Sequence, residues 1–260
     1  MSETRPDPEL PIGPTARLVL QRVGGRLDAL WRVALTPVLA LFVVQGGFIF
    51  LDPAEGETVG ARELLSAVAL PVALLAYAVL IRDWLRALAA PDGPVRPRLH
   101  LEAADLRFLL KLIGVGLLAL LSMIPLVLLG MALQGVPAAP ALVAAAGVVV
   151  ALSTAAAVGM GLPAAARGDR VPLPACWAAG QPVLGRIAAI VALTVLPLHL
   201  LVTMSGLTYG SLLTQDGGGP VVPVMALTLA LEVLELGVVG ALWHTLAGLR
   251  LAEHAGRGTP

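Results

Sequence analysis

Three ionisable side chains lie deep inside long apolar runs of this sequence: His199, Glu232 and Glu235. A charged group at the centre of a bilayer costs about 3 kcal/mol on insertion scales, so such groups must face a bundle interior or a wet cavity. With about 1.5 Å of rise per residue, His199 lies roughly 18 Å above the inner end of its run and Glu232 roughly 16 Å below the outer end of the next. These depths nearly coincide, and we expect a His199–Glu232 hydrogen bond.

The neighbours of these residues extend the polar face, because Thr203 lies one turn after His199 and Thr228 one turn before Glu232. Two interpretations of this mid-membrane group remain open. It is either a proton-responsive or cation-binding site of a small transporter or channel, or a neutral, hydrogen-bonded pair that fixes how two helices pack.

Signatures of other chemistry are missing from the sequence. It contains no phosphate-binding loop, no HExxH zinc motif and no GxSxG nucleophile motif. The single cysteine, Cys176, cannot form an internal disulfide, and no metal-ligand spacing surrounds it. A membrane enzyme would need the polar group Arg82, Asp83, Asp105 and Arg107, which pairs more simply as salt bridges. We expect no enzyme activity, no metal and no cofactor.

The composition indicates the elements that must hold these side chains. Of 260 residues, 58% are hydrophobic and 13% charged, and the mean hydropathy is +0.89. Apolar runs of about 20 residues cross a bilayer as helices. Six runs qualify: Trp31–Leu51, Leu64–Ile81, Phe108–Leu133, Ala141–Pro163, Ile187–Tyr209 and Val221–Trp243. The sequence therefore predicts an all-α, polytopic bundle of six spans with short cytoplasmic interfacial helices. Residues 13–255 form one domain between tails at 1–12 and 256–260.

Basic residues indicate the orientation of the bundle. With the N-terminus inside, sixteen of the 17 basic residues fall in cytoplasmic segments, and the outer loops keep only Arg62. This asymmetry follows the positive-inside rule. It predicts an inner-membrane protein with both termini in the cytoplasm. No basic tract resembles a nucleic-acid site.

Several residues are expected at the inner membrane interface. Residues 15–32 resemble an interfacial helix carrying Arg22 and Arg26, which either rests on anionic headgroups or only fixes the topology. Arg107 and Lys111 stand at the foot of the third span, where Lys111 can reach the interface. The tryptophans form a one-sided aromatic belt: Trp31, Trp84, Trp177 and Trp243.

The fourth span carries small residues at every fourth position, namely Gly147, Ala151, Ala155 and Gly159. Close backbone approach over small residues drives helix association in a bilayer, so we expect this helix to be buried at the centre of the bundle. Contact between two copies of the chain through the same ridge is the alternative.

The inner loops carry a resemblance. Its residues are Arg82, Trp84 and Arg86 after the second span, Arg98–Phe108 (RLHLEAADLRF), and Pro172–Trp177 (PLPACW). In these the chain resembles a broad group of uncharacterised bacterial six-helix integral membrane proteins. The group includes the membrane domain found beside some glycerophosphodiester phosphodiesterases. The resemblance implies a fold and no activity. The function expected first is a non-enzymatic accessory or assembly component that binds lipids, partner membrane helices or a second copy. A small transporter is the alternative.

Overall fold

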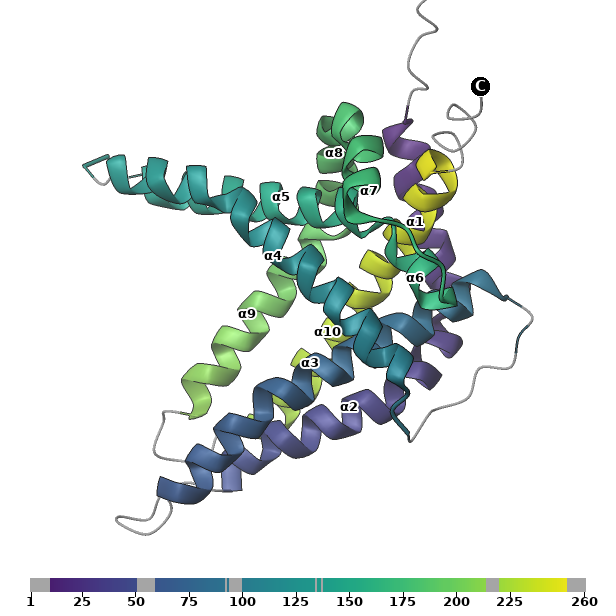
Figure 1. Cartoon of the computed structure of the whole chain (residues 1–260). Coiled ribbons are helices and arrows are strands. Elements are labelled where there is room, and N and C mark those ends of the chain that lie inside the picture. Colours follow the sequence, from purple (N-terminus) through teal and green to yellow (C-terminus); the bar gives the residue numbers. More distant parts are fainter. Residues whose placement is uncertain are drawn as a thin grey trace, which may run out of the picture.

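The computed structural model describes residues 10–50, 59–91, 93, 100–133, 135–136, 138–213 and 220–251. Within these ranges the chain is almost entirely helical and contains no strand (Figure 1). The predicted all-α bundle is confirmed. The two segments expected to be tails lie mostly outside the described residues.

The helices follow one another with short connections. They are α1 Ile12–Gly24, α2 Leu27–Phe50, α3 Val59–Ala89, α4 Ala103–Ala132, α5 Ala139–Gly159, α6 Leu162–Arg167, α7 Leu173–Gly180, η1 Gln181–Val183, α8 Leu184–Thr194, α9 Leu196–Leu213, α10 Val221–Leu246 and the π-helical turn η2 Ala247–Leu251. Helix α1 ends at Gly24, and Gly25 follows as its cap. The helix expected over residues 15–32 is therefore divided at the two glycines, which favour helix ends.

Among the described residues, six segments are long and apolar enough to cross a membrane, and the chain is a multi-pass membrane protein. All six overlap the predicted runs. The fifth, Leu173–Thr194, shares only residues 187–194 with the predicted run Ile187–Tyr209, because α8 ends at Thr194 and the rest of that run lies in α9. Pro197 falls in the first turn of α9, where a proline costs no hydrogen bond. The prolines at 37, 71 and 125 lie within continuous helices.

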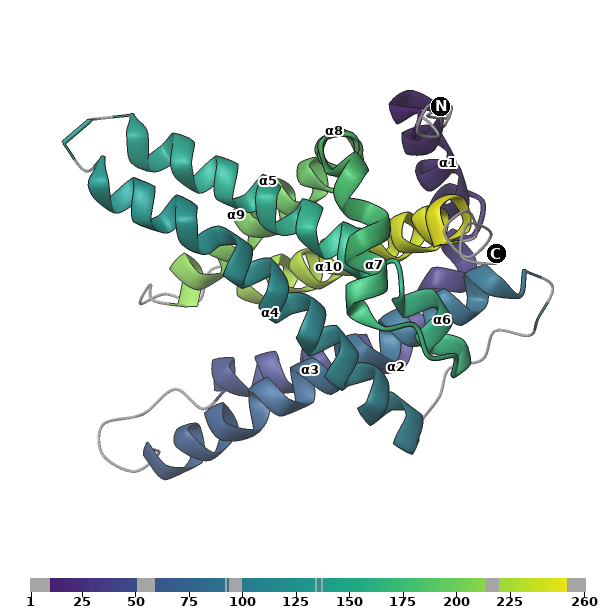
Figure 2. The ribbon, with the colours of Figure 1, turned by 45° about the horizontal axis from the view of Figure 1, so that its top comes forward.

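Six of the described long helices pack in pairs, α2 with α3, α4 with α5 and α9 with α10, and the pairs fan apart toward one end (Figures 1 and 2). Their other ends converge on a base where α1, α6, α7 and α8 lie. Helix α1 packs against α8 and the end of α10 there. We call this end the base throughout.

Helix α10 is the centre of the bundle. It contacts α1, α2, α3, α5, α6 and α9. The prediction that α5 is the buried central helix is wrong, because its half from Ala141 to Val150 is largely exposed and only the half at the base is buried. The small residues at every fourth position of α5 do pack against other helices of the same chain. A β-carbon at Gly147 would lie 3.1 Å from Met123 Cε on α4, and one at Gly159 would collide with the Trp243 indole on α10.

Two tryptophans expected in an aromatic belt are instead buried in the bundle. The Trp84 side chain is 0% exposed, and its Nε1–H donates to the Gly237 carbonyl oxygen on α10 at 2.8 Å. Trp243 is 4% exposed and donates to the Ala155 oxygen on α5 at 3.0 Å. A buried indole needs an acceptor, and these carbonyls supply it. Trp31 and Trp177 are exposed, as a belt requires.

Candidate functional site

The mid-membrane polar group forms two separate pairs. His199 Nδ1 lies 2.8 Å from Glu235 Oε1 and joins α9 to α10. The Tyr77 hydroxyl donates to Glu232 Oε2 at 2.6 Å and joins α3 to α10. The predicted His199–Glu232 hydrogen bond is therefore wrong, although all three residues lie in one region of the bundle.

A change of helix direction at Val195 accounts for the difference in partners. The predicted depth of His199 assumes one straight helix from Ile187, but α8 ends at Thr194 and α9 begins at Leu196. The two helices run in different directions (Figure 2), although the Val195 and His199 backbone N–H groups still donate to the carbonyl oxygens four residues before them. His199 consequently meets α10 one turn further along, at Glu235. Glu232 is occupied by Tyr77, a residue that the predicted site does not include. A phenol in the middle of an apolar span was the available signal, since a buried tyrosine hydroxyl needs a partner.

The hydroxyl groups near these pairs also form hydrogen bonds within the bundle. Ser205 Oγ and Thr228 Oγ1 lie 2.6 Å apart and form a further α9–α10 contact. Thr203 Oγ1 donates to the His199 carbonyl oxygen on its own helix at 2.8 Å, and its side chain is exposed. Thr228 therefore belongs to the interhelical polar contacts, and Thr203 does not reach across.

A double-mutant cycle tests the corrected pairing. The coupling between His199→Ala and Glu235→Gln is expected to be about 1 kcal/mol, the usual size for hydrogen bonds between membrane helices. The measurement is the free energy of unfolding in detergent. The cycle of His199→Ala with Glu232→Gln should give coupling near zero, and Thr203→Ala alone should be neutral. Equal coupling in both cycles would contradict the two-pair arrangement.

Arginines at the base bind the carbonyl ends of other helices. Arg26 of α1–α2 donates to the oxygens of Ala87 and, at 2.7 Å, Pro91, where α3 ends. Arg86 Nε donates to Ala166 O at 2.9 Å, in the last turn of α6. Arg250 donates to Ala179 O of α7 at 3.3 Å. The last carbonyls of a helix lack partners inside it and carry partial negative charge, so cations stabilise them.

Arg22 also binds within the protein. Its Nη1 lies 2.9 Å from His244 Nδ1 and donates to Thr245 Oγ1 at 2.9 Å, both on α10. Burial lowers the pKa of this guanidinium from its ordinary value. Residues 15–32 were expected either to rest on anionic headgroups or only to fix the topology. Arg26 binds the end of α3 and Arg22 binds α10, so any contact of these arginines with headgroups competes with contacts inside the protein.

A buried ionic group joins α3 to the start of α4. Arg82 Nη1 lies 2.5 Å from Asp105 Oδ1 and 3.0 Å from Glu102 Oε2. The side chains of Arg82 and Asp105 are 2% and 1% exposed. Asp105 Oδ2 also accepts the Glu102 backbone N–H at 2.7 Å, which closes the capping box of α4. The expected salt bridge across this hairpin is confirmed for Arg82 and Asp105.

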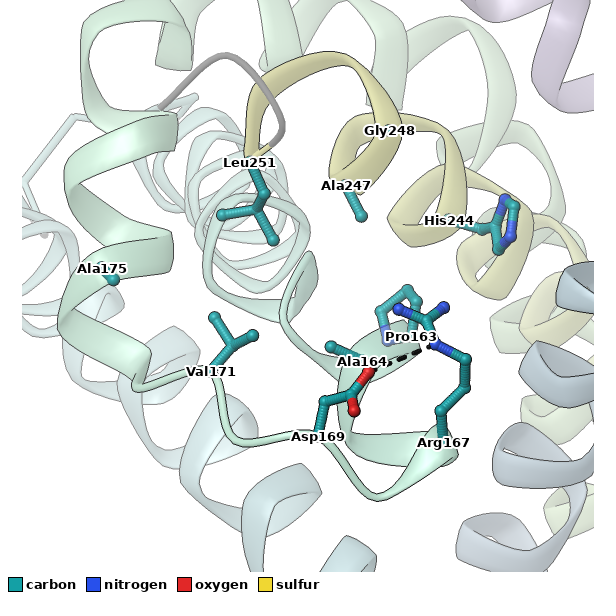
Figure 3. A pocket seen from close by; sticks show the side chains of 10 residues that line it. All are labelled: Pro163, Ala164, Arg167, Asp169, Val171, Ala175, His244, Ala247, Gly248 and Leu251. Atoms are coloured by element: carbon teal, nitrogen blue, oxygen red, sulfur yellow. Dashed lines mark hydrogen bonds and ion pairs between the residues drawn. The ribbon is translucent and has the colours of Figure 1, made fainter. Parts of the chain in front are cut away.

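Three apolar cavities and one polar cavity open on the surface that the described residues form. A mostly apolar cavity of about 580 Å³ lies at the base between α6, α7 and the end of α10. Figure 3 shows the Arg167–Asp169 ion pair across one side of it and His244 on α10 on another. Apolar cavities of about 240 Å³ lie between α2 and α3 and of about 410 Å³ between α4, α5 and α7. A polar cavity of about 400 Å³ lies beside Arg82.

No protein-family model, curated protein or solved structure matches this chain. Its function must be inferred from its own geometry.

Among the described residues no group of histidine, cysteine and carboxylate side chains could hold a metal ion. The single cysteine, Cys176, is buried and forms no disulfide. The mid-membrane acids and base are bonded to neighbouring helices, and none of the cavities named above is lined by His199, Glu232 or Glu235.

Proposed function

We propose that this protein is a non-enzymatic accessory component of a bacterial-type inner membrane, and that it holds lipid acyl chains in grooves on the side of its bundle. The observation that supports this proposal is the cavity between α4, α5 and α7. We call it the lateral groove. Its lining is Leu118, Ser122, Thr154, Val158, Leu173, Pro174 and Trp177.

The lateral groove has the size and lining of a site for an apolar ligand. Its volume of about 410 Å³ falls within the usual range of ligand sites, about 300–1,000 Å³. Both α4 and α5 are candidate spans, so the groove faces the hydrocarbon, where acyl chains are the abundant ligand. Trp177 of α7 stands at its edge and is 36% exposed, as suits an indole near the headgroups.

The mid-membrane pairs support this function over transport. A transporter that used them would need a water-filled path to His199 or Glu235. The hydrogen bonds of these residues are instead made to neighbouring helices, and satisfied polar pairs of this kind hold helices together in a bilayer.

The orientation belongs to the same proposal. The base carries the arginines of α1, of the end of α3, of the start of α4 and of α6, so from the positive-inside rule we expect it in the cytoplasm. Helix α1 and the end of α10 both lie at the base, which supports the expectation that both termini are cytoplasmic.

Filling the lateral groove tests the proposal. Ser122→Phe places a ring in the groove and should weaken binding of phosphatidylethanolamine about tenfold, because about two buried methylene groups lose their contacts. The measurement is native mass spectrometry of the detergent-solubilised protein titrated with the lipid. Leu121→Phe is the matched control, since Leu121 lies next to Ser122 but is 57% exposed.

The proposal requires loss in Ser122→Phe and retention in Leu121→Phe. Equal binding by both variants would contradict it. Proton flux into proteoliposomes that His199→Ala abolishes would favour the transporter.

A further inference from the structure

A polar cavity of about 400 Å³ lies at the base between the end of α3, the start of α4, and α6 with the turn that follows it. We call it the basic cavity. Six cationic side chains line it: Arg82, Arg86, Arg107, Lys111, Arg167 and Arg170. Two acidic residues, Glu102 and Asp169, also line it. Cations therefore outnumber carboxylates three to one around this space.

The innermost cation of the basic cavity is held rigidly. Arg82 is 2% exposed, and its Nη1 is fixed by Asp105 and Glu102. Its Nε is buried and has no hydrogen-bond acceptor among the described residues. A buried guanidinium N–H without an acceptor is costly, and a ligand with an anionic oxygen would supply one.

The outer cations remain available to a ligand. In the described part of the chain, Arg107, Lys111 and Arg170 form no hydrogen bond or ion pair with an acceptor, whereas Arg86 binds Ala166 O and Arg167 binds Asp169. Arg107 and Arg170 are exposed, and Lys111 is half-buried. Three cations from two segments thus face one space with their charges uncompensated.

We propose that the basic cavity binds a phosphoryl group. Guanidinium groups match phosphate oxygens in charge and in paired geometry. The cavity lies where α3 ends and α4 begins, which is the headgroup level of a membrane that these helices cross. Basic pockets between membrane helices on the cytoplasmic side suit anionic lipid headgroups. The ligand is an anionic phospholipid headgroup or free phosphate. This site differs from the lateral groove, which carries no charged side chain.

Two pairs of charge-removing variants test the site. Arg107→Gln with Arg170→Gln removes two cations of the basic cavity. Arg17→Gln with Arg32→Gln removes two exposed cations elsewhere on α1 and α2. Binding of phosphatidylglycerol and of phosphatidylcholine is measured by native mass spectrometry in detergent. Inorganic phosphate is titrated separately by calorimetry, and thermal unfolding checks that each variant is folded.

The cavity variant should bind phosphatidylglycerol about 30-fold more weakly than the unaltered protein, since each basic residue contributes about a fivefold gain in affinity. The control variant should change less than about threefold on the same scale. If phosphatidylglycerol shows no preference but inorganic phosphate binds and is lost in the cavity variant, free phosphate is the ligand.

The proposal is overturned if neither probe binds selectively, or if both variants lose binding equally. Phosphatidylcholine is the control for the lateral groove, because it carries acyl chains but no net charge. The cavity variant should still bind it, which shows that any loss of phosphatidylglycerol binding does not come from damage to the lateral groove.

Discussion

Replacing Arg82 with methionine is expected to lower the free energy of unfolding by about 3–5 kcal/mol, the range for breaking one side of a buried ion pair. The substitution leaves Asp105, which is 1% exposed, without its cation in the interior. It also removes the link between the end of α3 and the capping box of α4. Unfolding in detergent, followed by circular dichroism against added sodium dodecyl sulfate, measures the loss.

A second substitution, added to the first, distinguishes the loss of the buried ion pair from the change in side-chain packing at Arg82. In Arg82→Met with Asp105→Asn, the buried charge is gone and the amide oxygen that replaces the carboxylate still accepts the Glu102 N–H, so part of the stability should return. Arg32→Met is the control, because Arg32 and Asp28 form an exposed pair at 3.6 Å that is worth at most about 1 kcal/mol. A full loss that the second substitution does not relieve would assign the effect to packing instead.

Trp84→Ala is expected to have a comparable effect, about 3–5 kcal/mol, because truncating a buried tryptophan leaves a large void. The Trp84 ring fills the space above Gly240, where a β-carbon would lie 2.6 Å from its Cδ1. The Gly237 carbonyl oxygen of α10 also loses the donor that joins it to α3. The same unfolding measurement reports the change.

Trp31→Ala provides the comparison for Trp84. Trp31 is 41% exposed, and surface substitutions usually change stability by about 0.5 kcal/mol or less. If both tryptophans served only as interface anchors, the two variants would lose similar amounts. Trp84→Phe keeps most of the ring and isolates the hydrogen bond, for which a loss of about 1 kcal/mol is expected.

The long elements of the fold could be predicted because hydropathy alone determines which segments enter a bilayer. The salt bridge at Arg82 could also be predicted, since both partners flank one short connection. The partner of His199 could not. The predicted depth assumes a straight helix, and a change of direction between α8 and α9 at Val195 moves the residues of α9 relative to α10. The end of α1 could be predicted, because the paired glycines Gly24 and Gly25 weaken a helix and α1 ends at Gly24.

The position of a residue along a span also does not predict whether its side chain points into the bundle or outward. Trp84 and Trp177 both lie near the base, yet one points into the bundle and the other outward. The small residues of α5 likewise contact α4 at Gly147 and α10 at Gly159, so one ridge serves two partners. The basic cavity was missed for a related reason. Its cations come from three stretches of sequence, and each alone looked like an ordinary flank of a span.

Arg26, Arg86 and Arg250 donate to main-chain oxygens at helix ends. Their positive charge thus has two roles: it sets the orientation of the chain in the membrane, and it holds the helices together at the base. Membrane insertion counts lysine and arginine alike, so a version of the chain with lysines at these three positions would enter the bilayer the same way round. A lysine ammonium lacks the planar fork that grips a helix end from the side. Such a chain would insert in the same orientation, but its helices would be held together more weakly at the base.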